Sequence, residues 1–277
     1  MRYHPANVLL SPLAWFWRTA ARNLLFASRP FTLCFIALGL TTIPSLNARA
    51  QEAVALAHGN VPGEPHHHLK IENEYVRVYY VEVPPHEDTQ LHQHDNDYIY
   101  VSLGPSDVVN AILNKPEIHL QFKDGETHFT RGGFAHVARN LADSPFRNIT
   151  IELLRPQAEA RNVCGPVILD AGFAECDPPP GSWSAMTQFE TAEVKLDHVV
   201  LSGNGKYRDK VSELAFLVVG LGGSDIKLIG NDKSPKTLQA GGMEWFDRGS
   251  KVRFSNAGTK PAEFLRLIFK RPHYLKK

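Results

Sequence analysis

The stretch that decides the fold is Val76-Arg77-Val78-Tyr79-Tyr80-Val81-Glu82-Val83. Valine and tyrosine, which are enriched in strands, fill most of its positions. A second segment of this kind follows at residues 98–103. From residue 76 onward such segments are separated by Gly, Pro, Asn and Asp, and no long stretch with a 3.6-residue period appears after residue 60. The sequence therefore predicts an all-β fold of sandwich or barrel type.

The same pattern occurs twice along the chain. Residues 76–109 align with residues 194–227 without a gap at an offset of 118, and after a two-residue deletion the offset becomes 116. Turn residues are kept in both copies, as in the pairs Gly125 and Gly241, Gly133 and Gly249, Asn140 and Asn256, and Pro145 and Pro261. We therefore predict two similar β-domains, at residues 69–156 and 186–273.

The first fifty residues differ in character from the rest. Arg18, Arg22 and Arg29 precede an apolar run at residues 31–40, and Ala48-Arg49-Ala50 supplies small residues for cleavage after Ala50. The run is shorter than the roughly 20 apolar residues that a membrane-spanning helix needs. We expect residues 1–50 to be a signal peptide, with an uncleaved anchor as the alternative, and the protein to be periplasmic or secreted. The part before Arg29 is long for such a signal, which leaves the translation start open.

Two further segments flank the first domain. Residues 51–68 are expected to form a loose leader, and we interpret the tract His66-His67-His68 within it as solvated, although it resembles a metal-binding tract. Residues 157–185 form the expected linker, because the Pro178-Pro179-Pro180-Gly181 break fits neither strand nor helix. Cys164 and Cys176 are the only cysteines after the presumed signal. An even pair in an exported protein predicts a disulfide.

Composition narrows the classes of partner. The chain has 277 residues and a formal net charge of +1, which gives no electrostatic reason to expect nucleic acid or an anionic membrane surface. It contains no Gly-rich phosphate loop and no Ser nucleophile elbow. The expected partner is a small-molecule substrate.

Three histidines form the predicted site. His92 and His94 are two residues apart, a spacing that sends both side chains to one face of a strand. His136 follows a Gly-rich stretch and would come from a different strand. Three imidazoles on one barrel face could bind a divalent transition metal and leave positions open for water or substrate.

The residues around His136 resemble the second motif of the cupin superfamily, G-x5-P-x-G-x2-H-x3-N. Residues 125–140 match every fixed position except Arg131, which replaces Pro. With its internal repeat, the chain is similar to a bicupin. The resemblance covers about ninety residues per copy and implies a jelly-roll barrel for each.

The first cupin motif, G-x5-H-x-H-x3-4-E-x6-G, fits less well. His92 and His94 match, but no Glu stands where the family has its fourth ligand. Counting places either Asp97 or Tyr98 there. If Tyr98 faces inward, so does Tyr100, and the pocket is lined by hydroxyls; if Asp97 does, the pocket is apolar. We favour Tyr98 inward, because it continues the spacing of the two histidines, and keep Asp97 as an alternative ligand.

The second copy lacks the predicted ligands. Lys210, Ser212 and Val252 stand where His92, His94 and His136 stand in the first, and the positions of Asp97 and Tyr98 hold Ala215 and Phe216. We therefore expect the second domain to be structural, either packing its sheet against the first domain or forming a homodimer interface.

The resemblance implies a mononuclear-metal enzyme with His92, His94 and His136 as ligands. Fe²⁺ is the expected ion, with Mn²⁺, Zn²⁺ or Ni²⁺ as alternatives. Tyr98, Tyr100 or His128 could transfer protons, and Arg131 could hold a substrate carboxylate. The alternative for His128 is that it is an ordinary histidine of a strand, without a role in the site. The alternative for Arg131 is that it is a surface charge. A dioxygenase-like reaction on a small oxygenated substrate is the leading hypothesis, ahead of an isomerase or decarboxylase; a non-catalytic metal-binding or ligand-binding protein is the alternative.

Overall fold

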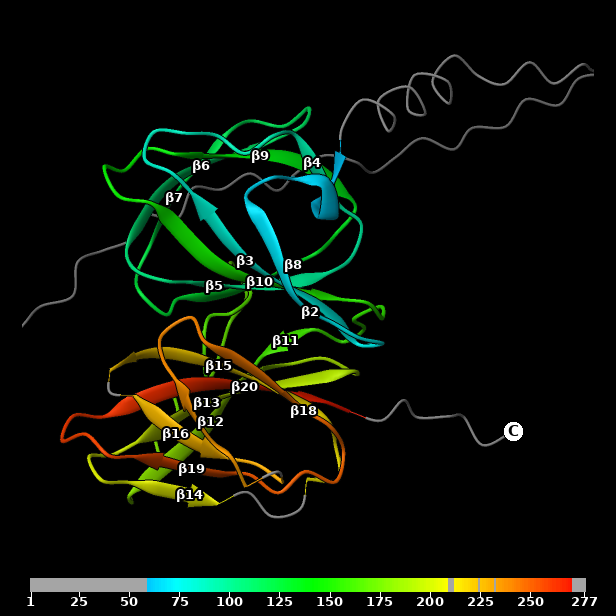
Figure 1. The fold of residues 1–277 in the computed structure, drawn as a ribbon. Coiled ribbons are helices and arrows are strands. Elements are labelled where there is room, and N and C mark those ends of the chain that lie inside the picture. The colour runs from blue at the N-terminus through cyan, green and yellow to red at the C-terminus, as the bar shows by residue number, and fades with distance from the viewer. Residues whose placement is uncertain (1–58, 209–211, 224, 232, 271–277) are drawn as a thin grey trace, which may run out of the picture. The chain divides into compact units, whose positions relative to one another are not determined.

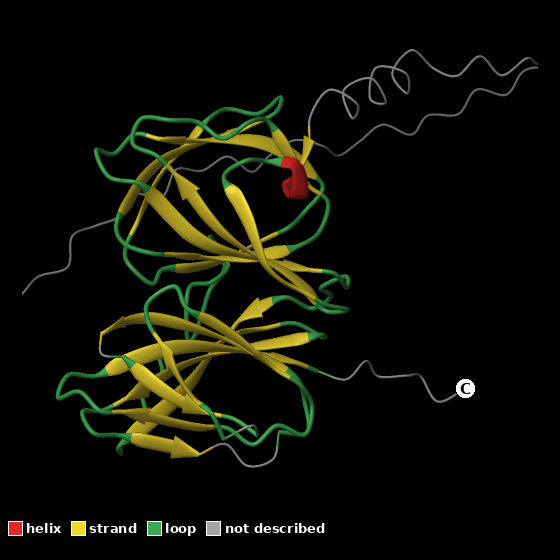
Figure 2. Cartoon of the chain, in the orientation of Figure 1, coloured by secondary structure: helices red, strands yellow, loops and turns green. Residues whose placement is uncertain are grey.

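The computed structural model describes residues 59–208, 212–223, 225–231 and 233–270. Nearly every element in this part of the chain is a β-strand, apart from one turn of 3-10 helix, η1, at Val61–Gly63 (Figure 2). The expected signal segment, residues 1–50, and Lys210 lie outside the described residues. Among the residues described, no helix is long and apolar enough to cross a membrane.

The first barrel has two five-stranded sheets, in the orders β1-β4-β9-β6-β7 and β2-β3-β10-β5-β8 (Figure 1). The strands of the first sheet are β1 (Gly59–Asn60), β4 (His92–His94), β9 (Phe134–Asn140), β6 (Ser106–Ile112) and β7 (Ile118–Phe122). Those of the second are β2 (His67–Glu72), β3 (Val76–Val83), β10 (Phe146–Leu153), β5 (Tyr98–Ser102) and β8 (Thr127–Thr130). Strands distant in sequence are neighbours in both sheets, as a jelly roll requires.

The second barrel repeats this order. Its sheets run β11-β12-β13-β20-β15-β18 and β14-β19-β16-β17. The larger sheet contains β11 (Arg161–Asn162), β12 (Trp183–Glu190), β13 (Val194–Leu201), β20 (Ala262–Phe269), β15 (Phe216–Gly223) and β18 (Met243–Phe246). The smaller contains β14 (Lys206–Arg208), β19 (Arg253–Asn256), β16 (Ile226–Ile229) and β17 (Pro235–Leu238). The prediction of two tandem jelly-roll barrels is confirmed.

The turns that close the two barrels are built alike. Asn140 donates from Nδ2 to three carbonyl oxygens, those of Val83, Pro84 and Ser144. Asn256 makes the equivalent three bonds in the second barrel. Each asparagine therefore joins two chain segments and pairs their carbonyl groups. This role in folding is the same in both barrels, which explains why the second copy retains the asparagine although it lacks the predicted metal ligands.

One of the hydrophobic clusters contains residues of both barrels. Ile99 and Val101 of β5 are fully buried and pack in the same cluster as Leu217 and Val219 of β15. Phe129 and Phe189 meet across this junction with ring centroids 4.9 Å apart. Of the two roles expected for the second domain, packing its sheet against the first is the one the structure shows.

The interior of the second barrel is filled by apolar side chains. Val252 and Phe216, which replace His136 and Tyr98 of the first copy, are fully buried in this cluster. Burying one such side chain stabilises the fold by about 1.5–3 kcal/mol. The space that holds polar groups in the first barrel is therefore hydrophobic core in the second.

The expectation of a loose leader is wrong for its described part. Gly59–Asn60 pairs in parallel with β4, and Val61 is fully buried in the core of the first barrel. His67 and His68 begin β2 and pair with β3. Strand pairing and the burial of Val61 hold this segment on the first barrel.

Candidate metal centre

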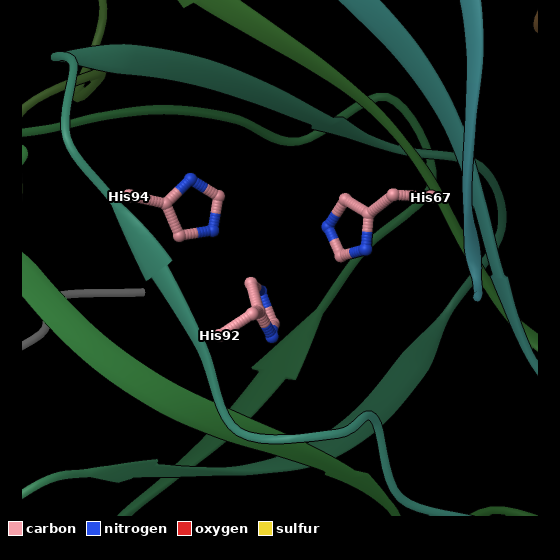
Figure 3. A group of neighbouring side chains, drawn as sticks. All are labelled: His67, His92 and His94. Atoms are coloured by element: carbon pink, nitrogen blue, oxygen red, sulfur yellow. The ribbon is translucent and has the colours of Figure 1, made fainter. Parts of the chain in front are cut away.

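Four histidine side chains from three strands meet inside the first barrel. His67 comes from β2, His92 and His94 from β4, and His136 from β9. One ring nitrogen from each of the first three lies within 4.8 Å of the others, and the rings face a common space (Figure 3). The ring of His136 lies with its centroid 4.6 Å from that of His92 and 5.1 Å from that of His94. The structure thus brings together the three predicted histidines and adds His67.

Hydrogen bonds fix the proton of two of these rings on Nδ1. His92 donates from Nδ1 to the carbonyl oxygen of Gln90 over 2.8 Å, and His136 donates from Nδ1 to Oδ1 of Asn110 over 2.7 Å. Each ring therefore keeps Nε2 unprotonated, with its lone pair free. Both Nε2 atoms are buried without a hydrogen-bond partner among the described residues. Leaving such a group unpaired costs about 1–3 kcal/mol, which a bound metal ion would offset.

His67 is oriented by a buried carboxylate. Its Nδ1 donates to Oε2 of Glu64 over 2.6 Å, and the side chain of Glu64 is fully buried. Burial alone would raise the pKa of Glu64, but the hydrogen bond and charge of His67, with the backbone N–H groups of Gln90 and His66, lower it to about 2. This carboxylate–histidine pair is the arrangement that orients histidine ligands in metal sites, because it leaves Nε2 as the ligand atom.

Burial keeps His92, His94 and His136 in their neutral form at pH 7. Burial, with the neighbouring His67 ring, lowers the pKa of His92 to about 4. Burial and the rings of His92 and His67 lower that of His136 to about 3, and burial with the other three rings lowers that of His94 well below its ordinary value. Neutral imidazoles are the form that binds a metal. The donor set suits Fe²⁺, Zn²⁺ or Ni²⁺ better than Mn²⁺, which prefers oxygen ligands.

Asp97 does not join the histidines. Its Oδ2 accepts a hydrogen bond from Arg131 over 2.7 Å and its Oδ1 accepts one from the backbone N–H of Gly132 over 3.0 Å. Arg131 also donates to the carbonyl of Gln157 and lies over the ring of Phe129. The alternative of Asp97 as fourth ligand therefore disagrees with the geometry. The Arg131 guanidinium, expected to hold a substrate carboxylate, is already engaged by Asp97 at the cavity rim.

Tyr98 faces the cluster. Its ring stacks on His94 with centroids 4.2 Å apart and an interplanar angle of 21°. Tyr100, two residues on, also lines the cavity, whereas Ile99 between them points into the core shared by the barrels. Burial raises the pKa of both tyrosines, so their hydroxyls stay protonated. The inward orientation of Tyr98 and Tyr100 agrees with the strand-parity prediction.

His128 lies behind the cavity wall. It is buried, its ring packs against Tyr100 and Phe122, and its Nε2 is 2.9 Å from a carboxylate oxygen of Glu126. It is absent from the cavity lining. His128 can therefore influence the site through Tyr100 but does not reach a molecule bound beside the four histidines.

The histidines open into a cavity of about 550 Å³. Its wall is mostly apolar, with Val108, Phe122, Phe134 and Phe146 among the lining residues. Asn110, Asn148, Thr130 and Thr150 add hydrogen-bonding groups. This volume suits a small organic molecule, whose few polar atoms would lie near the histidines.

Comparison with known proteins gives likenesses of fold. No family model matches the chain, and no curated protein matches its sequence. A crystal structure of salicylate 1,2-dioxygenase from Pseudoaminobacter salicylatoxidans with gentisate is 12% identical, with a TM-score of 0.54 over 80% of this chain and 78% of that one. AerE from Microcystis aeruginosa is 10% identical, with a TM-score of 0.51 over 75% of this chain and 99% of that one.

A cupin 2 conserved barrel domain protein from Leptotrichia buccalis gives a TM-score of 0.50 at 10% identity, over 74% of this chain and 88% of that one. At such low identity these likenesses show the fold alone.

Proposed function

We propose that this chain, a protein with the cupin fold, is an exported bicupin that binds one divalent transition metal in its first barrel and oxidises a small oxygenated substrate in a dioxygenase-like reaction. The observation that carries the metal site is the group of His67, His92 and His94, which each offer one ring nitrogen within 4.8 Å of the others. His136, whose ring centroid lies 4.6 Å from that of His92 and whose Nε2 is buried without a partner among the described residues, would be the fourth ligand. Glu64 holds His67 in place.

Fe²⁺ is the ion that we propose. Iron supplies Lewis acidity and redox chemistry at positions that the protein leaves open. The four histidines would hold the ion, and the cavity beside them would admit the oxygen-bearing end of a substrate. The salicylate dioxygenase that shares the fold supports an oxidative reaction as the first choice, while an isomerase or decarboxylase would use the same site without oxygen consumption.

The residues of the chain then have separate roles. The four histidines hold the ion, and Tyr98, stacked on His94, keeps that ring in its orientation. Tyr100 and Tyr98 remain protonated, so each can donate a hydrogen bond to a substrate oxygen. The apolar wall excludes water from the rest of the cavity.

Export is supported by the disulfide between Cys164 and Cys176. Disulfides persist in oxidising compartments and are rare in the cytosol. The disulfide, with the apolar run and the small residues near residue 50, supports the proposal that the protein acts in the periplasm or outside the cell.

Metal analysis followed by oxygen-electrode measurements tests this function. Protein purified without added metal, and protein reconstituted with Fe²⁺, would be screened against small phenolic, enolic and dicarbonyl compounds. We expect one metal per chain and substrate-dependent oxygen uptake, both lost in His92→Gln and kept in His119→Gln, which replaces an exposed histidine of β7. Reconstituted protein that binds no metal would contradict the proposal.

A second function is favoured by the number of histidines. Catalytic metal sites keep positions open, whereas structural or storage sites are filled by protein ligands. If the ion is tetrahedral, four imidazoles saturate it, and the protein is a non-catalytic periplasmic cupin that sequesters metal. Stoichiometric metal without oxygen uptake, and without displacement by small chelating anions, would select this alternative.

A further inference from the structure

The loop closed by the disulfide reaches the cavity of the first barrel. Cys164 and Cys176 are joined, and we call residues 164–176 the disulfide loop. Two of its residues, Leu169 and Asp170, line the cavity that contains the four histidines. The loop belongs to the segment between the barrels, yet its tip contributes to the wall of the metal-binding one.

The tip is fastened in three ways. Val167 is buried in the core between the barrels, and its carbonyl accepts a hydrogen bond from the backbone N–H of Phe129 in β8 over 2.8 Å. The side chain of Asn162 bonds to N–H and C=O of Ile168 and to the C=O of Ala171, on either side of the tip. The disulfide closes the base of the loop. The position of the tip is therefore built into the fold.

The tip completes an apolar mouth. Leu169 is 54% exposed, and Ile118 of β7, which also lines the cavity, is 48% exposed. Both side chains are partly exposed and both line the cavity, so an apolar group of a bound molecule that reached them would cover apolar surface that now contacts water. Phe134 and Ile112 continue the apolar wall inward toward His136.

We propose that the disulfide loop is the outer wall of the cavity and selects substrates with an elongated apolar body. The oxygen-bearing end of such a molecule would lie at the histidines, and its apolar body would pass Leu169 on the way to solvent. The position of the oxygen-bearing end rests on the proposed function. The contact between the apolar body and the wall is independent of that function.

A series of n-alkyl hydroxamates tests whether the cavity wall binds an elongated apolar group. The hydroxamate group chelates a metal through two oxygens, and the alkyl chain measures apolar contact farther out. Acetohydroxamate, hexanohydroxamate and decanohydroxamate would be titrated into metal-loaded protein by calorimetry. We expect tighter binding with each methylene that enters the wall, by about fourfold per fully buried group.

Two substitutions in the same loop distinguish the loss of a contact in the cavity wall from general damage to the loop. Leu169→Ala removes a lining side chain, and Phe173→Ala removes one of similar exposure, 50%, that does not line the cavity. We expect Leu169→Ala to weaken decanohydroxamate binding about fivefold and to leave acetohydroxamate binding unchanged. Phe173→Ala should change neither. The double variant Cys164→Ser/Cys176→Ser should also lose affinity for the long probe only.

Equal behaviour of Leu169→Ala and Phe173→Ala toward decanohydroxamate would overturn the proposal. If the double cysteine variant fails to fold, the two single variants still decide. Failure of the proposed metal site has a different signature, because metal content is measured separately. In that case displacement of a fluorescent apolar dye by decanohydroxamate from metal-free protein replaces the calorimetry, and the same contrast between the two variants is expected.

Discussion

Replacing Glu64 by Gln should weaken the metal site without touching a ligand. The carboxylate accepts three hydrogen bonds: from Nδ1 of His67 over 2.6 Å, from N–H of His66 over 2.8 Å and from N–H of Gln90 over 3.1 Å. A glutamine amide has one acceptor oxygen. If that oxygen takes the place of Oε2, the amide nitrogen takes the place of Oε1 and faces the backbone N–H of Gln90. Both groups are hydrogen-bond donors, so the N–H of Gln90 loses its acceptor.

The magnitude follows from these contacts. A buried donor left unsatisfied costs about 1–3 kcal/mol, and the bond to His67 loses its charge assistance as well. We therefore expect Glu64→Gln to lower the free energy of unfolding of the metal-free protein by about 1–3 kcal/mol. Loss of a carboxylate that orients a histidine ligand typically weakens metal binding 10–100-fold, and we expect a loss in that range.

The assay is competitive metal titration against a chromophoric chelator, together with urea unfolding of metal-free protein. Glu72→Gln is the matched control, because Glu72 lies on β2, the strand of His67, and makes an exposed ion pair with Arg77. Such pairs contribute about 0–1 kcal/mol. Equal metal affinity of Glu64→Gln and Glu72→Gln would refute the assignment of His67 as a ligand held by Glu64.

Three further predictions concern the same barrel and its neighbouring loop. His136→Ala should lower metal affinity at least tenfold while circular dichroism shows an intact fold, and an unfolded product would contradict the separation of site from core. Metal-free protein should lose stability as pH falls, because the pKa of His92 and that of His136 are lowered to about 4 and about 3, below about 6.5 in the unfolded chain. The unfolded state then binds more protons than the folded state. The free energy of unfolding is therefore highest above pH 6.5 and falls by about 2 kcal/mol per histidine on going to pH 5. Urea unfolding at pH 7.5 and at pH 5 measures this difference, and equal free energies of unfolding would contradict it. Removing the disulfide by Cys164→Ser/Cys176→Ser should cost about 3 kcal/mol of folding free energy, seen as a lower melting temperature than that of the oxidised protein, and an unchanged melting temperature would show that the loop is held by its other contacts alone.

The fold could be predicted because its determinants are local and repeated. Val76–Val83 has the length and composition of a strand and forms β3 with those bounds. The repeat predicted a second barrel, and the paired Asn140 and Asn256 perform the same closure in both. Tyr98 faces inward as predicted, but not for the reason given by its spacing from His94. A turn separates the two residues, and β4 and β5 belong to different sheets, each of which turns one face to the barrel interior.

The parts of the site that the sequence analysis missed depend on contacts between distant segments. His67 reaches the cluster because β2 and β4 lie in different sheets of one barrel, a relation that no local pattern encodes. The signal available was Glu64 three residues before His67, a spacing that allows a carboxylate to orient an imidazole. Asp97 was kept as a ligand because its partner, Arg131, is 34 residues away and its charge pairing could not be seen from spacing. The contribution of Leu169 to the cavity is of the same non-local kind.

X-ray absorption spectroscopy of the metal-loaded protein tests the central claim most directly. We expect one metal per chain with four imidazole nitrogens at about 2.0–2.1 Å, and three in His67→Ala. A metal environment that is the same in the native protein and in His67→Ala, or the absence of bound metal after reconstitution, would contradict it.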